Sequence, residues 1–121
     1  MSQVNIIVAS GDSARLYAAL EAAMAWTALG GSVEIFCQGE AVAALRRPLF
    51  HGGDRARVAA GQPDLATLLG EVRDAGAVLF VCQTGLALVG MTMEELAVDA
   101  RAAGLVGYLA AIPPGALVVT Y

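Results

Sequence analysis

Two cysteines are the residues of this sequence best suited to chemistry, and each ends a short apolar run. Cys37 closes SVEIFC (residues 32–37) and Cys82 closes AVLFVC (residues 77–82). A thiol becomes a nucleophile when it ionises, and a nearby helix N-terminus favours the thiolate. Gly85 follows Cys82 closely, so the chain can turn tightly with no side chain shielding the sulfur. Cys82 is therefore the candidate nucleophile, with the alternative that it is an inert core residue, as free cysteines often are.

Other classes of site lack the residues they need. His51 is the single histidine, and two separated cysteines without further ligands do not make a zinc site. The sequence contains neither of the glycine-rich motifs that hold phosphates, G-x-G-x-x-G after the first strand or G-x-x-x-x-G-K-[ST]. G-x-S-x-G is also missing, so a serine triad would need His51 from a long loop. We expect no bound metal and no organic cofactor.

A long segment without clear periodicity carries the remaining candidates. Residues 48–63 read PLFHGGDRARVAAGQP, and loops of this length inside a compact domain are usually functional lids or mobile segments. His51, Arg55 and Arg57 would stabilise an anionic sulfur or substrate if this loop folded over the strand ends. The alternative is a solvated loop with scattered charges. Cys37 is the candidate resolving thiol for Cys82, with a buried structural role as its alternative.

Apolar runs alternate with helical patterns along the whole chain. Near-continuous apolar strands separated by helices are typical of parallel sheets covered on both faces. We therefore predict one domain over residues 1–121, a Rossmann-like three-layer α/β/α fold with a mostly parallel sheet of about five strands. The carboxyl ends of such strands form the ligand crevice, and both cysteines stand there. The expected strands are residues 4–9, 32–37, 77–82, 105–108 and 116–121, and the expected helices are 13–29, 40–47, 64–75 and 92–103.

Composition limits the partners. Hydrophobic residues make up 58% of the 121 residues and charged residues 15%, an apolar excess that favours contact between subunits. The net charge of −4 and the pI near 4.7 argue against nucleic-acid binding, which depends on clustered Lys and Arg. We expect a homo-oligomer whose partners are proteins or small molecules.

Two uncharged runs raise the question of a membrane. Residues 75–93 and 102–121 are long enough to span a bilayer, but polar residues and glycines interrupt the first, and Pro113-Pro114-Gly115 interrupts the second. The N-terminus also lacks the basic and apolar pattern of a signal peptide. The two cysteines form no CxxC motif, which suits a reducing compartment. We expect a cytoplasmic protein with no membrane association.

The order of elements and several short motifs resemble one known family. The features that carry the likeness are Ile6-Ile7-Val8, the glycines 30–31 before VEIF (33–36), the run LFVC (79–82) followed by Gly90 and an acidic capping box, and the closing LVVTY (117–121). Together they look like the DsrE/DsrF-like family, over nearly the whole chain. The resemblance implies a small α/β protein, often a trimer or hexamer. In TusD-like sulfur relay subunits of this family, a cysteine at the position of Cys82 carries sulfur as a persulfide.

Three hypotheses follow for function. The first is a sulfur carrier, or sulfurtransferase, that accepts and passes sulfane sulfur on Cys82, with donor and acceptor proteins or small polysulfides as partners. The second is a homo-oligomeric binding or scaffold module whose cysteine is structural. The third is a redox sensor that forms a reversible disulfide between Cys37 and Cys82.

Overall fold

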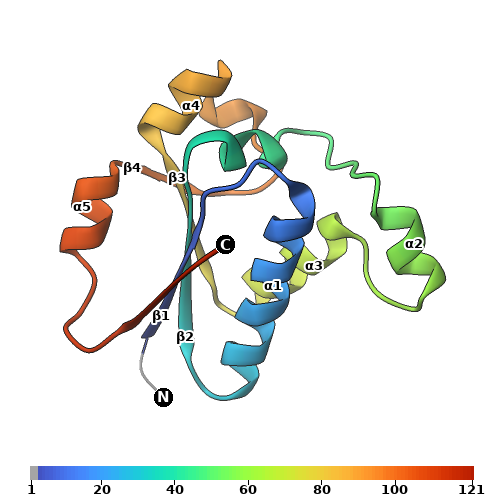
Figure 1. Ribbon diagram of the computed structural model, residues 1–121, viewed down its shortest axis with the longest axis horizontal. Helices are drawn as coiled ribbons and strands as arrows, with labels where there is room; N and C mark the ends of the chain where they lie inside the picture. The colour runs from blue at the N-terminus through green and yellow to red at the C-terminus, as the bar shows by residue number, and fades with distance from the viewer. Residues whose placement is uncertain (1–2) are drawn as a thin grey trace.

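Five parallel strands form the centre of the protein. The computed structural model describes residues 3–121, and its strands stand in the order β4-β3-β2-β1-β5. Every neighbouring pair is parallel, which confirms the predicted α/β sheet. Figure 1 shows the sheet nearly edge-on, with β5 nearest the viewer. The strands are β1 (Gln3–Val8), β2 (Ser32–Cys37), β3 (Val78–Cys82), β4 (Arg101–Ala103) and β5 (Leu117–Thr120).

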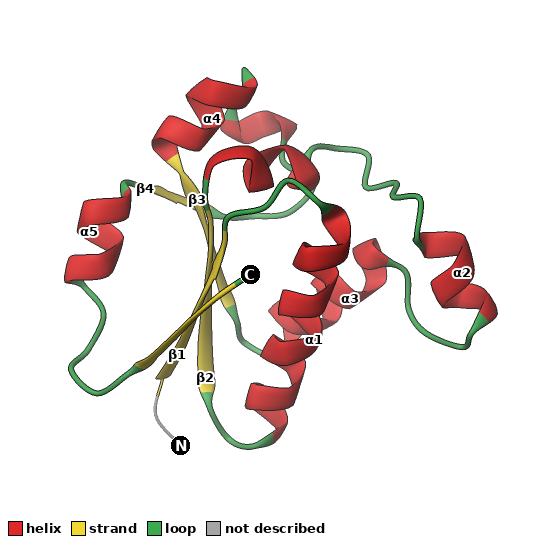
Figure 2. Ribbon diagram, in the orientation of Figure 1, coloured by secondary structure: helices red, strands yellow, loops and turns green. Residues whose placement is uncertain are grey.

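Helices cover the two faces of the sheet unequally. Figure 2 shows α1 and α3, with α2 beyond them, on one side of the sheet and α5 alone on the other. The segments η1 and α4 lie over the carboxyl ends of the strands. The bounds are α1 (Ser13–Ala28), η1 (Gly39–Leu45, a 3-10 helix), α2 (Asp54–Ala59), α3 (Leu65–Asp74), α4 (Gln83–Val89), η2 (Met93–Glu95, a 3-10 helix) and α5 (Leu105–Ala110).

Alternation along the strands divides the buried residues into two clusters. The larger cluster lies under α1 and α3 and contains Val81 of β3, together with Cys37. The smaller cluster lies under α5 and contains Ile7, Phe36, Cys82 and Tyr108. Successive side chains of a strand point to opposite faces, so β1, β2 and β3 each contribute to both clusters.

Capping residues fix the two long helices where the sequence predicts. The Asp12 carboxylate accepts a hydrogen bond from the Ala14 amide at 2.9 Å, at the start of α1. The Asp64 carboxylate accepts one from the Thr67 amide at 2.8 Å, at the start of α3. Each bond satisfies a backbone donor that has no partner within its helix.

The predicted helix over residues 92–103 is wrong. Thr92 and Glu95 form the expected capping box, but only the 3-10 helix η2 follows it. The reason is a pairing distant in sequence: the Arg47 amide donates to the Glu95 carbonyl at 2.8 Å, and the Ala97 amide donates to the Leu45 carbonyl at 2.8 Å. These bonds occupy the groups that would continue the helix.

Two further assignments change. The expected strand at 105–108 is the helix α5, and residues 101–103 supply the strand β4 instead. A short apolar run fits a strand or a buried helix equally well, and here Leu105, Tyr108 and Ile112 all face the sheet at helical spacing.

The expected loop 48–63 contains the helix α2. Within residues 3–121, no helix is long and apolar enough to cross a membrane.

Candidate functional site

Cys82 stands at the junction between a strand and a helix. It is the last residue of β3 and the N-cap of α4, with φ −71° and ψ 128°. The helix begins directly at Gln83. The thiol therefore lies at the carboxyl edge of a central strand, beside the unpaired amides of the first turn of α4.

Four donors surround the Cys82 sulfur. The Thr84 hydroxyl lies 3.0 Å from Sγ. The backbone amides of Thr84 and Gly85, in the first turn of α4, also donate to the sulfur. The fourth donor is the amide of Gly39, at the start of η1 after the neighbouring strand β2. We call Thr84, Gly85 and Gly39 the sulfur nest.

The sulfur nest favours the ionised thiol. Burial alone would raise the pKa of Cys82, because a charge is poorly solvated inside the protein. The hydrogen bonds from the Thr84 hydroxyl and the three amides outweigh burial, so the pKa of Cys82 falls below its usual value. Hydrogen bonds to a charged acceptor are stronger than those to a neutral one, so they lower the pKa of Cys82 by more than burial raises it. The site therefore makes ionisation of Cys82 easier through uncharged hydrogen-bond donors.

Gly85 brings α4 into contact with η1. A Cβ at position 85 would lie 2.8 Å from Val42 Cγ2 and 2.9 Å from the Gly39 amide nitrogen, closer than real side chains approach. Gly39 itself has φ +56°, a conformation that side chains rarely adopt. The two glycines thus allow the amides of two separate elements to reach one sulfur atom.

A cover of aromatic and apolar side chains lies over the same face of the sheet. The exposed fraction of Cys82 is 3%. Tyr108 of α5 packs against Phe36 at 4.6 Å and Phe80 at 5.2 Å between ring centroids. Its hydroxyl donates to the buried Asn5 side chain at 3.2 Å. Burial raises the pKa of Tyr108, so the phenol keeps its proton and remains the donor.

Cys37 ends the adjacent strand but points the other way. It pairs in register with Val81, the residue before Cys82, and so faces the α1 and α3 side of the sheet. Its side chain is fully buried, and this burial raises the pKa of the thiol to about 12. The structure therefore does not bring the two thiols together, and a disulfide between them would require backbone movement.

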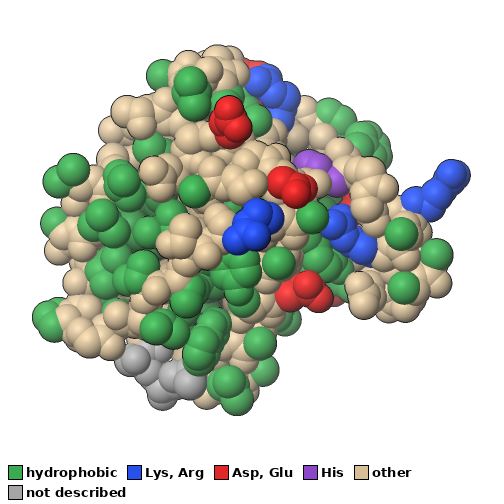
Figure 3. Space-filling model, viewed as in Figure 1, with side chains coloured by type: hydrophobic (Ala, Val, Ile, Leu, Met, Phe, Trp, Pro, Cys, Tyr) green, Lys and Arg blue, Asp and Glu red, His purple; other side chains and the backbone are tan. Residues whose placement is uncertain are grey.

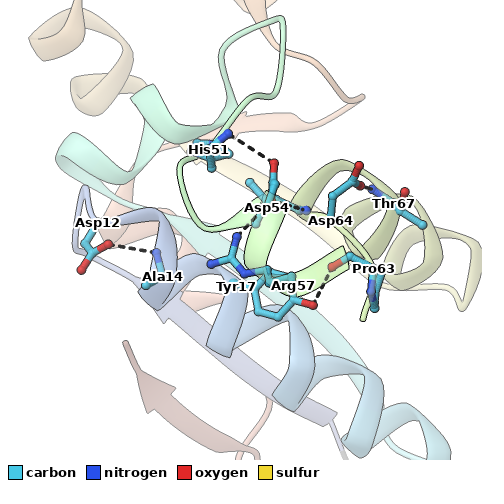
Figure 4. Close-up of polar contacts among 10 residues, drawn as sticks. Asp12, Ala14, Tyr17, His51, Asp54, Arg57, Pro63, Asp64 and Thr67 are labelled. Atoms are coloured by element: carbon cyan, nitrogen blue, oxygen red, sulfur yellow. Dashed lines mark hydrogen bonds and ion pairs between the residues drawn. The ribbon is translucent and has the colours of Figure 1, made fainter. Parts of the chain in front are cut away.

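The long loop does not reach Cys82 either. The Asp54 carboxylate accepts hydrogen bonds from the His51 amide at 3.2 Å, from Arg57 Nη1 at 3.0 Å and from the Leu65 amide at 2.9 Å (Figure 4). Arg57 also stacks over Tyr17 of α1, 4.0 Å from the ring centroid.

These contacts fasten the loop to the outer helices. Arg55 is exposed on α2, which Figure 1 places well away from the end of β3. His51, Arg55 and Arg57 are therefore anchoring or solvent-facing residues, and none of them faces the sulfur. Among residues 3–121, no group of three or more acidic, histidine or cysteine side chains is placed to hold a metal.

Comparison with known proteins shows the family to which this fold belongs. The model of the DsrE/DsrF-like family matches residues 3–121. The chain belongs to the DsrE/DsrF-like family. This confirms the resemblance inferred from the sequence, and the curated proteins contain no match to set beside it.

Two solved structures share the fold of this DsrE/DsrF-like chain over 100% of both chains. One is the ychN protein from E. coli, with a TM-score of 0.78 and 17% identity. The other is MTH1491 from Methanobacterium thermoautotrophicum, described as a protein of unknown function, with a TM-score of 0.76 and 14% identity. At these identities the likeness shows the fold.

Sequence reasoning missed most of the sulfur nest in this family member. Thr84 was within reach of prediction, because a hydroxyl in the first turn after a strand-ending cysteine is well placed to bond the sulfur. Gly39 gave a weaker signal: it follows Cys37 by two residues, and parallel strands bring such segments to one edge. Its contact with Cys82 depends on the register of β2 and β3, which no local pattern contains.

Proposed function

We propose that this protein is a sulfur carrier that holds sulfane sulfur as a persulfide on Cys82. The observation that carries the proposal is the sulfur nest, in which hydrogen bonds from three backbone amides and the Thr84 hydroxyl lower the pKa of Cys82. What the DsrE/DsrF-like resemblance implies for a cysteine at this strand end supports the same role.

The proposed transfer is balanced without an external oxidant. The Cys82 thiolate attacks the outer sulfur of a donor R–S–SH, an S–S bond forms to Cys82, and the donor's own S–S bond breaks to release R–S⁻. An acceptor thiolate then attacks the outer sulfur on Cys82 and restores the thiolate. Sulfane sulfur carries its oxidation level with it, so the reaction requires no organic cofactor. We expect it to take place in a reducing compartment such as the cytoplasm.

The burial of Cys82 selects for small donors. With 3% of its surface exposed, this residue is reached more easily by a linear polysulfide than by a protein thiol. An added sulfur would lie about 2 Å beyond Sγ, the length of an S–S bond, and so closer to an acceptor. Delivery to a protein acceptor would require movement of the aromatic and apolar side chains that cover this face of the sheet beneath α5.

The test is sulfur uptake measured by intact mass. Wild-type protein exposed to sodium tetrasulfide, then freed of reagent, should gain the mass of one or more sulfur atoms, and dithiothreitol should remove it. Cys82→Ser should gain none, whereas Cys37→Ser should gain as much as wild type. If wild-type Cys82 remains unmodified by tetrasulfide yet is alkylated by iodoacetamide, the carrier proposal fails.

The second candidate is a binding or scaffold module in which Cys82 is structural. The near-complete burial of Cys82 favours it. Under this alternative, native Cys82 resists both tetrasulfide and iodoacetamide, and Cys82→Ser preserves the fold and any assembly. The same intact-mass experiment therefore separates the two candidates.

A further inference from the structure

Two glutamines next to Cys82 have side-chain amides that the fold does not use. Gln83 follows Cys82 as the first residue of α4. Gln38 is the N-cap of η1 and comes directly before Gly39, whose amide donates to the sulfur. Gln38 makes no capping bond through its side chain, and the hydrogen bonds within residues 3–121 include neither glutamine amide. Both amides are therefore free to bind a ligand.

Gln38 stands beside Cys82 on the neighbouring strand. β2 and β3 are in register at Cys37 and Val81, so the next residues, Gln38 and Cys82, are neighbours. The backbone of Gln38 is extended, with φ −108° and ψ 144°. Because Gln38 follows Phe36 by two residues, its side chain continues on the face that Phe36 shares with Cys82.

Gln83 lies on the other side of the sulfur, toward β4. Cys82 pairs in register with Ala103, and Gly104 follows as the N-cap of α5. Gln83 Oε1 lies 4.0 Å from the point where a Cβ on Gly104 would stand. The side chain of Gln83 thus crosses from α4 to the junction between β4 and α5. With Gln38 toward β2, the two glutamines flank Cys82 from both sides.

Formation of a persulfide moves negative charge away from the sulfur nest. The outer sulfur arrives with the proton of the donor's S–H group and passes it to the released R–S⁻, so the charge then resides on the outer sulfur. This atom lies about 2 Å beyond Sγ, the length of an S–S bond. The four donors of the nest address Sγ itself. The charged outer sulfur therefore requires donors of its own.

Uncharged donors suit this side of the molecule. Residues 102–121, which include α5, contain no charged side chain, and in the face shown in Figure 3 no acidic or basic side chain lies over α5. A glutamine amide carries two N–H donors. Hydrogen bonds to an ionised acceptor are roughly twice as strong as those between neutral groups. Two such amides can therefore stabilise a sulfur anion without an ion pair.

We propose that the side-chain amides of Gln38 and Gln83 form the binding site for the terminal sulfur of a persulfide on Cys82 and donate hydrogen bonds to this sulfur in its ionised form. The inference rests on the sulfur-carrier proposal and adds the residues that hold the transferred sulfur. The sulfur nest then acts on the attacking thiolate, and the two glutamines act on the stored persulfide.

The pH dependence of alkylation tests this site. Protein loaded with sodium tetrasulfide and freed of reagent is treated with iodoacetamide over a range of pH, and the mass of the Cys82 peptide separates alkylated persulfide from alkylated thiol. Gln38→Leu and Gln83→Leu should each raise the pH midpoint for alkylation of the persulfide by about one unit, because each removes a hydrogen bond to a charged sulfur. The midpoint for the sulfur-free thiol should keep its wild-type value, which shows that the nest is intact.

Gln62→Leu is the matched control, since it makes the same change at an exposed glutamine between α2 and α3. Both of its midpoints should equal those of wild type. If the persulfide midpoints of Gln38→Leu and Gln83→Leu also equal that of wild type, this inference is overturned and the sulfur-carrier proposal stands. A wild type that gains no sulfur on Cys82 would overturn both.

Discussion

Cys37 and Cys82 end adjacent parallel strands at the same edge of the sheet, yet their surroundings have opposite effects on the thiol. Cys37 faces the large core under α1 and α3, and burial raises its pKa to about 12. Cys82 is also buried, but the sulfur nest outweighs burial and its pKa falls. Burial alone therefore does not decide whether a cysteine is inert. The donors supplied by the next element of the chain, here α4, and by η1 make the difference.

Removing the Tyr108 ring, which packs on the Cys82 face of the sheet, should increase the difference in reactivity between the two cysteines most. Tyr108→Ala would leave a cavity beneath α5 and should lower the free energy of unfolding by about 3–5 kcal/mol, the cost of truncating a buried aromatic. Because Tyr108 lies on the face of Cys82, iodoacetamide should then alkylate Cys82 faster while Cys37 stays unreactive. Urea denaturation and peptide mapping measure the two effects. Tyr108→Phe is the control: it loses only the bond to Asn5, and its Cys82 should react at the wild-type rate.

A methyl group at Gly85 should break the sulfur nest. Gly85→Ala places a carbon against Val42 and the Gly39 amide, and we expect a loss of about 1–3 kcal/mol in unfolding free energy, typical of overpacking. Displacing Gly39 removes a donor from Cys82, so the pKa of the thiol should rise toward its usual value. The rate of alkylation against pH reports this change.

Gly107→Ala is the matched control for that substitution. It lies within α5, and a Cβ there meets nothing within 4 Å. We expect its stability to equal or slightly exceed that of wild type, since alanine favours a helix over glycine by roughly 0.5–1 kcal/mol. Equal stability of Gly85→Ala and Gly107→Ala would contradict the close approach of α4 and η1.

Thr84 should control reactivity more than stability. Thr84→Val keeps the shape of the side chain but removes the hydroxyl bond to Cys82, and loss of a hydrogen bond to a charged group, worth ~1.5 kcal/mol, should slow alkylation at neutral pH about tenfold. Thr84→Ser retains the hydroxyl and should react at nearly the wild-type rate. A Thr84→Val protein as reactive as wild type would show that the amides act alone.

The smallest effect is expected on the opposite side of the molecule, at Asp54. Burial would raise the pKa of this carboxyl, but bonds from the Leu65 and His51 amides and from Arg57 lower it. A carboxyl whose folded pKa is depressed contributes stability above its unfolded pKa, about 3.9, and loses that contribution as the pH falls through the folded value. Urea titrations across the acid range should show a shallower acid loss for Asp54→Asn than for wild type. Alkylation of Cys82 at neutral pH should be equal in the two proteins.

The sequence predicts what depends on local patterns, and fails where distant segments pair. The sequence predicts β1, β2 and β3, the starts of α1 and α3 and the position of Cys82 from apolar runs and polar boundaries. The short η2 does not, because its end is fixed by backbone bonds to residues 45–47.

The chemistry of the two cysteines shows the same limit. Their placement at strand ends is local, but the face that each occupies depends on the register of β2 against β3. The sequence therefore favours Cys82 through the glycine that follows it, but the donors that distinguish its thiol from that of Cys37 depend on the packing of η1 on α4.

Site-resolved sulfur uptake measures the difference between the two cysteines. Native wild-type protein is exposed briefly to sodium tetrasulfide, its remaining thiols are blocked, and the peptides that contain Cys37 and Cys82 are weighed separately. We expect added sulfur on the Cys82 peptide and none on the Cys37 peptide. Added sulfur on Cys37, or on neither peptide, would contradict this expectation.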